Sequence, residues 1–291
     1  MVNFAAWLFV VIWATGFVVA RGISGLIDPY LFLLVRFTSV LIIFSAAMLV
    51  MRSALPNSAE RWRLLGIGAL MQGLYLGPGF WAVSAGLEAG VMALVGTLQP
   101  PLTAVLAWYF FKEQIGKQVI IGLLIGICGV VLAIAPGLTN QTSSNDISVW
   151  VMTAAVMSIG SITAGTLLQK SSIVSVPLLS SVTFQTLGAV IVMLPMAIVL
   201  GDWVFPFTPT AFAYLGYAVV VLSIGGFTLF TWMVRTGSAT RASSLLLLVP
   251  PLAALMAWQL YDEALGLQQL TGFALALAGV LMARSQKGLA T

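Results

Sequence analysis

The feature that most restricts the possible fold is a stretch of sequence that occurs twice. It begins at Leu98 as LQPPLTAVLAWYFFKEQIGKQ and again at Leu248 as LVPPLAALMAWQLYDEALGLQQ. The paired prolines, Trp108 and Trp258, and the glycines that follow keep a constant offset of 150 residues through Ala133. An ungapped match of this length predicts two copies of one unit of about 150 residues.

The two copies differ in charge. Lys112 and Lys117 follow the first tryptophan, whereas Asp262 and Leu267 hold the matching positions of the second copy. In membrane proteins Lys and Arg accumulate on the cytoplasmic side, so this exchange predicts that the copies have opposite orientations.

The composition supports a membrane environment. The chain is 60% hydrophobic and 7% charged, whereas soluble domains carry roughly a quarter charged residues. Spanning a bilayer takes about 20 apolar residues. Ten segments fit, near 3–22, 30–51, 64–85, 90–111, 118–135, 148–169, 178–200, 210–234, 240–261 and 268–284. We therefore predict an all-α integral membrane protein of ten transmembrane helices, with inverted five-helix repeats at 1–135 and 148–291 and a linker at 136–147.

Loop charges predict the orientation. If the N-terminus is cytoplasmic, the predicted inner loops hold most of the basic residues, and the outer loops hold Asp28, Glu88, Asp146, Asp202, Asp262 and Glu263. Both termini are then cytoplasmic, and we expect the bacterial inner membrane. The first apolar segment has no charged leader before it, so we interpret it as a retained helix and not as a signal peptide.

Several function classes find no support. The chain has no histidine, one cysteine, no GxxxxGK[ST] loop and no basic run. We therefore expect no enzyme activity, no cofactor or metal, and no nucleic-acid partner. Repeated helices without a catalytic cluster favour a secondary transporter whose small-molecule site lies between the repeats. We expect a monomer or a weak homodimer.

The third apolar segment offers candidate binding residues. Gln72, Tyr75 and Gly79 share a helix face, and Gly77-Pro78-Gly79 is expected to break the helix in mid-membrane. This pattern indicates a wall of the substrate cavity, with Pro78 as a hinge. The alternative is a kinked helix whose rings pack on neighbouring helices.

Other candidates come from helices that the inverted arrangement would bring together. Trp13 and Phe227 are expected to hold an apolar side chain of the substrate; Gln99, Thr231 and Ser244 are expected to bond its polar end. The alternative for each aromatic residue is ordinary packing between helices or against lipid.

Two sets of residues are open to more than one interpretation. Pro100, Pro101, Pro250 and Pro251 either serve the local helix structure or mark bending elements of alternating access. Arg36 lies inside the second segment, where a cation is rare. It either extends to the outer surface, pairs with Glu88, or contacts a substrate carboxylate. The dense glycines of the fifth and tenth segments indicate scaffold helices or dimer contacts and not the pore.

The sequence resembles the drug/metabolite transporter superfamily, and within it the EamA family. The resemblance covers nearly the whole chain. It is carried by WATGFVVARG at residues 13–22, by Pro29 followed by Arg36-Phe37, by the twice-repeated Pro-Pro…Trp…Glu…Gly, and by the closing Gly-Val pairs at Gly129 and Gly279. Within the family, the chain looks like the YddG-type exporters of aromatic and other amino acids.

The resemblance implies a central cavity lined by the first, third, fourth, sixth, eighth and ninth helices, with the fifth and tenth outside it. We accordingly predict export of small metabolites, chiefly amino acids with large apolar side chains, by alternating access. The competing function is efflux of hydrophobic drugs or organic cations, which a buried acid would favour; Glu88 is the one weak candidate.

Overall fold

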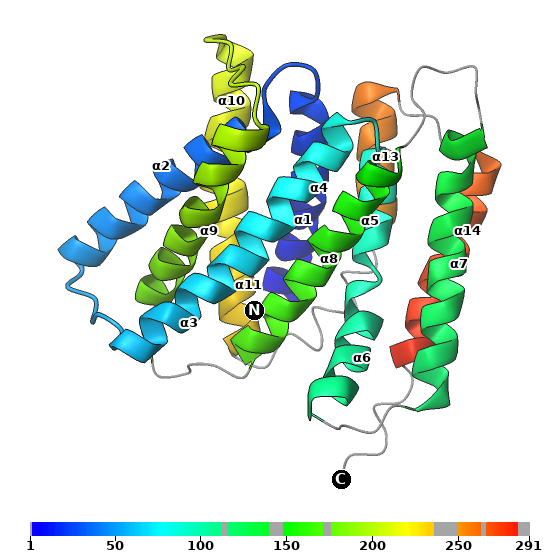
Figure 1. Cartoon of the computed structure of the whole chain (residues 1–291), viewed down its shortest axis with the longest axis horizontal. Helices are drawn as coiled ribbons and strands as arrows, with labels where there is room; N and C mark the ends of the chain where they lie inside the picture. The colour runs from blue at the N-terminus through cyan, green and yellow to red at the C-terminus, as the bar shows by residue number, and fades with distance from the viewer. Residues whose placement is uncertain are drawn as a thin grey trace.

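The structure is a computed structural model that describes residues 2–111, 116–139, 148–170, 176–235, 249–262 and 266–284. Helices make up almost all of these residues, and no strand occurs among them. The predicted all-α class is therefore confirmed. The helices stand side by side, with α7 and α14 at one end of the molecule and α2 at the other (Figure 1).

From α2 onward the helix bounds of the two halves match closely at the offset seen in the sequence, whereas α1 and α8 begin at Val2 and Val149. The first half holds α1 (Val2–Ile23), α2 (Pro29–Val50), α3 (Ser58–Gly68), η1 (Ala69–Gly73), α4 (Leu74–Ser84), α5 (Ala89–Gly96), α6 (Gln99–Phe111) and α7 (Lys117–Thr139). The second holds α8 (Val149–Lys170), α9 (Leu178–Leu200), α10 (Pro209–Tyr217), η2 (Ala218–Phe227), α11 (Thr228–Arg235), α13 (Val249–Tyr261) and α14 (Leu267–Arg284). The described helices thus recur as pairs, such as α6 with α13 and α7 with α14.

Polar residues at the helix starts explain several of these bounds. Asp28 caps α2 by accepting a bond from the Leu31 backbone N–H at 2.8 Å, and Pro29 occupies the first turn, where no backbone N–H is needed. Asn57 and Glu60 form a reciprocal capping box at the start of α3. These caps stabilise helix ends that lie near the expected membrane surfaces.

The third apolar segment of each half contains a π-helical stretch. η1 lies between α3 and α4, and η2 lies between α10 and α11 at the equivalent place. The break predicted at Gly77-Pro78-Gly79 is wrong, because α4 continues through Pro78 and the departure from α geometry comes one turn earlier. Near the proline, the Ser158 hydroxyl on α8 donates to the Tyr75 carbonyl oxygen at 2.6 Å and helps to satisfy the local backbone.

Glycines bring α7 and α14 into backbone contact. A Cβ added to Gly129 would lie 2.4 Å from the Ala276 nitrogen, and one added to Gly279 would lie 2.5 Å from the Gly122 oxygen. The partner numbers on α7 fall as the numbers on α14 rise, so the two helices run antiparallel. This is the close approach that small residues allow between helices in lipid.

The pair α2 and α9 also runs antiparallel. The hydroxyls of Ser53, just after α2, and Ser180, near the start of α9, are 2.8 Å apart. At the other end, the Asp28 carboxylate before α2 accepts bonds from the backbone N–H groups of Asp202 and Trp203, just after α9. Both ends of this pair are therefore tied by polar contacts.

Long apolar helices indicate a multi-pass membrane protein. Among the described residues, four helices are long and apolar enough to cross a bilayer: Pro29–Val50, Val149–Gln169, Leu178–Leu200 and Pro209–Met233. Shorter apolar helices cover Trp7–Ile23 and Ile120–Ala133. Large apolar side chains such as Leu49 and Val199 are exposed on the outside, as a lipid-facing surface requires.

Two predicted segments have different bounds in the structure. The expected helix at 90–111 is divided into α5 and α6 by a turn at Thr97 and Leu98. The expected linker at 136–147 begins too early, because α7 continues to Thr139; the remaining linker positions lie outside the described residues.

Candidate functional site

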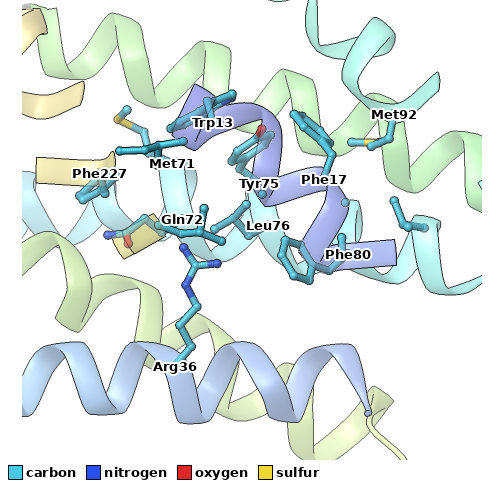
Figure 2. Close-up of a pocket in the computed structure, with 16 residues that line it drawn as sticks. Trp13, Phe17, Arg36, Met71, Gln72, Tyr75, Leu76, Phe80, Met92 and Phe227 are labelled. Atoms are coloured by element: carbon cyan, nitrogen blue, oxygen red, sulfur yellow. The ribbon is translucent and has the colours of Figure 1, made fainter. Parts of the chain in front are cut away.

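A cavity lies between α1, α2, η1, α4, α5 and η2 (Figure 2). It has an empty volume of about 670 Å³, which includes the space at its opening. Residues of both halves of the chain line it, since η2 belongs to the second half. The resemblance implied a lining that includes the sixth and ninth helices. Among the described residues, α8 (the sixth span) and α13 (the described part of the ninth span) contribute none to the lining, whereas α2 contributes Arg36.

Six of the residues singled out in the sequence line this cavity. They are Trp13 on α1, Arg36 on α2, Gln72 in η1, Tyr75 and Gly79 on α4, and Phe227 in η2. Gly79 has no side chain and lines the cavity with its backbone. A Cβ added at this position would lie 3.1 Å from the Ser158 hydroxyl oxygen and 3.3 Å from the Met92 methyl group. The predicted face of the third segment is thus turned to the cavity.

Three predicted binding residues are not in the lining. The Gln99 amide donates to the Thr166 hydroxyl at 3.1 Å and links α6 to α8. Thr231 is fully buried in α11, and its hydroxyl has no hydrogen-bond partner among the described residues. Ser244 lies outside the described residues. The structure therefore does not bring Gln99 or Thr231 to the cavity that holds Tyr75.

One wall of the cavity is aromatic. The rings of Trp13 and Tyr75 stack with their centroids 6.2 Å apart and an interplanar angle of 10°. The ring centroids of Phe9 and Phe230 lie 5.0 and 5.5 Å from that of Trp13. Sequence analysis missed Phe17 and Phe80 as lining residues, although Phe17 lies one helical turn from Trp13 and shares its face.

Arg36 points into the cavity. Its side chain is 4% exposed, its Nε donates to the Ser223 hydroxyl at 2.8 Å, and its guanidinium group extends toward Gln72 (Figure 2). The predicted extension to the outer surface is therefore wrong. The Ser223 bond explains the difference, because η2 packs on α2 and supplies a partner inside the protein.

The predicted pairing of Arg36 with Glu88 is also absent. Glu88 precedes α5 and accepts a hydrogen bond from the Gln269 side chain on α14, outside the cavity lining. Ser223 is instead the polar partner that the structure gives Arg36 among the described residues.

Gln72 is the second polar side chain at this end of the cavity. It is 2% exposed, and its Nε2 has no hydrogen-bond partner in the part of the chain that the structure describes. A buried amide donor without a partner costs free energy, which a bound ligand can recover by accepting its hydrogen bond.

The first proline pair lies at a helix start. Pro100 and Pro101 are in the first turn of α6, directly after the turn at Thr97 and Leu98. A proline in the first turn removes no intrahelical bond, so this pair does not bend a continuous helix. Pro250 and Pro251 are among the first described residues of α13, and the residues before Val249 lie outside the described part of the chain. At the end of α5, the Leu94 carbonyl accepts hydrogen bonds from the Thr97 backbone N–H at 2.9 Å and from the Thr97 hydroxyl at 2.7 Å.

The EamA-like transporter family model matches residues 1–135 and 147–285. The chain belongs to the EamA-like transporter family. It is therefore a membrane transporter and not an enzyme, and the resemblance noted in the sequence is confirmed.

Known proteins of this kind match nearly the full chain. A probable amino-acid metabolite efflux pump of Salmonella typhimurium is 26% identical over 96% of this chain and 93% of its own length. The transporter YvbV of Bacillus subtilis is 24% identical over 95% and 89%. A chloroplastic WAT1-related protein of Arabidopsis thaliana is 24% identical over 95% of this chain and 67% of its own length.

A solved crystal structure shares the fold. It covers 97% of this chain and 97% of its own, with a TM-score of 0.65 and 17% sequence identity. At this identity the likeness concerns the arrangement of the helices and not the substrate.

Proposed function

We propose that this protein exports small metabolites, amino acids with large apolar side chains among them, across the bacterial inner membrane by alternating access. The observation that carries the proposal is the cavity between the two halves, with stacked rings on one wall and Arg36 and Gln72 at its polar end. An apolar wall with a few convergent polar groups is typical of small-molecule sites. The name of the Salmonella relative supports amino-acid metabolites as the substrate class.

We further propose two inverted five-helix repeats, at 1–135 and 148–291, with ten membrane spans and both termini in the cytoplasm. Two observations support this arrangement. From α2 onward the helix bounds recur at close to one offset, and the equivalent pairs α7–α14 and α2–α9 run antiparallel. Two equivalent helices in antiparallel contact are what an inverted repeat produces at its axis.

In this arrangement, alternating access moves the third and fourth spans of the chain, which belong to the first repeat, against the eighth and ninth spans, which belong to the second. The hinge positions that we propose are Pro78, within α4, and the two proline pairs, Pro100-Pro101 in the first turn of α6 and Pro250-Pro251 in α13. The turn at Thr97 and Leu98 before α6 can change direction without breaking internal helix bonds.

Efflux of organic cations is the competing function, and the positive charge of the cavity lining disfavours it. Arg36 is the charged side chain of the described lining, which contains no Asp or Glu. A cation would therefore meet a like charge with no acid to offset it.

Efflux from proteoliposomes tests the proposal. Vesicles containing the protein are loaded with labelled phenylalanine, threonine or a lipophilic cation, and protein-free vesicles serve as the control. We expect protein-dependent efflux that is fastest for phenylalanine. Identical loss of all three compounds with and without protein would end the transporter assignment for this chain.

A further inference from the structure

We infer that the cavity binds its substrate as a monoanion, with a carboxylate on Arg36, and that aromatic carboxylates without an amino group bind more tightly than the matching amino acids. This inference rests on the proposed function, since it names the charge class that the same cavity accepts. It separates three classes of ligand: anion, zwitterion and cation.

Arg36 carries a charge that no described lining residue compensates. The guanidinium group stays protonated in proteins, and burying a charge without a partner of opposite sign is costly. Arg36 is 4% exposed, and the part of the lining that the structure describes contains no carboxylate. A ligand with one negative charge supplies the missing counter-charge.

The remaining donors of the Arg36 guanidinium group are directed into the cavity. Ser223 accepts from Nε of Arg36 and so fixes one edge of the guanidinium plane. The terminal amino groups of that plane extend toward Gln72 and the cavity (Figure 2). Two adjacent N–H donors match the two oxygens of a carboxylate.

Gln72 adds a third donor to the cavity. Its Nε2 is buried without a partner among the described residues, and Figure 2 shows its amide group on the Phe227 side of the Arg36 guanidinium group. A cluster of donors without an acidic neighbour favours an acceptor-rich group over an ammonium group.

The remaining lining is apolar and largely aromatic. Beyond Arg36 and Gln72 the cavity is formed by Leu76, Phe80 and the Trp13–Tyr75 pair. A flat apolar body fits against these stacked rings. The cavity thus combines one anion-binding end with an aromatic wall.

The positively charged amino group of a zwitterionic ligand weakens its binding to the cavity. In an α-amino acid the ammonium is attached to the carbon next to the carboxylate, so a carboxylate on Arg36 brings the ammonium close to the guanidinium. No acidic side chain of the described lining offsets this repulsion. Removing the amino group from the ligand removes the repulsion and keeps the ion pair.

Binding of a matched ligand series to the purified full-length protein tests the inference. Phenylpropanoate, phenylalanine, phenylpropanamide and phenethylamine share a ring and a side chain but differ in charge. Calorimetry in detergent is expected to rank phenylpropanoate first, phenylalanine second, and the neutral amide and the amine at least about 30-fold weaker than phenylpropanoate. This comparison uses the wild-type protein, so it does not depend on the folding of a variant.

Variants test whether Arg36 causes the preference for the anionic ligand. Arg36→Gln is expected to lose the preference for phenylpropanoate over phenylpropanamide, and Arg36→Lys to retain part of it. Arg63→Gln is the matched control, because Arg63 is exposed on α3 and is not among the residues that line the cavity. Ser223→Ala is expected to lower the preference without abolishing it, since Ser223 positions the guanidinium group.

The outcomes separate this inference from the proposed function. Equal or tighter binding of phenethylamine, or an unchanged preference in folded Arg36→Gln protein, would overturn the inference even if efflux persists. Selective binding of phenylpropanoate supports it even if vesicles show no protein-dependent efflux, a result that would count against transport alone.

Discussion

At the scale of single residues, the aromatic wall offers a direct test. Tyr75 is 6% exposed and its ring stacks on Trp13. We expect Tyr75→Ala to weaken transport of phenylalanine by roughly tenfold, because a stacking partner is lost, and Tyr75→Phe to retain most activity, because the ring remains. The apparent KM and the maximal rate in proteoliposomes measure the effect.

A matched aromatic outside the cavity controls for general damage to the protein. Trp108 is half exposed on α6 and does not line the cavity. Trp108→Ala is expected to leave KM unchanged. If the two alanine variants lose transport equally, or if Tyr75→Phe is as poor as Tyr75→Ala, stacking in the cavity is not the reason.

The cavity residues differ in how far their positions follow from sequence. Gln72, Tyr75 and Gly79 were predicted together because helix periodicity fixes a shared face. The direction of Arg36 does not follow in the same way, because a long flexible side chain reaches either the surface or the interior. The Ser223 hydroxyl, far away in the sequence, decides it.

At the scale of elements, two glycines hold α3 and α9 together. A Cβ on Gly68 would lie 1.7 Å from the Gln185 carbonyl oxygen, and one on Gly188 would lie 2.1 Å from that of Leu65. We expect Gly68→Ala to destabilise the protein by about 1–3 kcal/mol, because backbone must move to admit the methyl group. The thermal midpoint in detergent measures this loss.

Gly66 provides the control on the same helix. A Cβ there would meet no atom within 4 Å, so Gly66→Ala is expected to leave the midpoint unchanged or to raise it. Equal destabilisation by the two substitutions would show that contact with α9 is not the cause, because helix propensity alone favours alanine over glycine.

The π-helical stretches are the element-level feature that sequence did not predict. A π-turn has no composition signal comparable to proline or glycine. The Gly77-Pro78-Gly79 sequence predicts a helix break at these residues, whereas the π-helical stretch η1 lies about one turn earlier in the chain. The π-helical stretches agree with the repeat once they are known, since η1 and η2 occupy equivalent places in the two halves. Their common position beside the cavity agrees with the frequent occurrence of π-bulges at functional sites.

At the scale of the whole molecule, the repeat was the most informative part of the sequence. Its offset anticipates the helix pairs, and the exchange of Lys112 for Asp262 anticipates the antiparallel packing of α7 and α14. The contacts between the halves do not follow from it. They depend on which helix faces meet, as where the Glu88 carboxylate accepts a bond from Gln269.

The membrane orientation of the two halves is testable with single cysteines. Cys128 is the one cysteine of the chain, so Cys128→Ser provides the background. Lys117 and Leu267 are exposed at the starts of α7 and α14, which run antiparallel, so their positions are expected on opposite sides of the membrane. An impermeant maleimide added to intact cells should label Leu267→Cys at once and Lys117→Cys only after permeabilisation, because lysine is retained on the cytoplasmic side. Labelling of both positions from one side would contradict the inverted repeat, and the assignment of the cavity to an interface between inverted halves would fail with it.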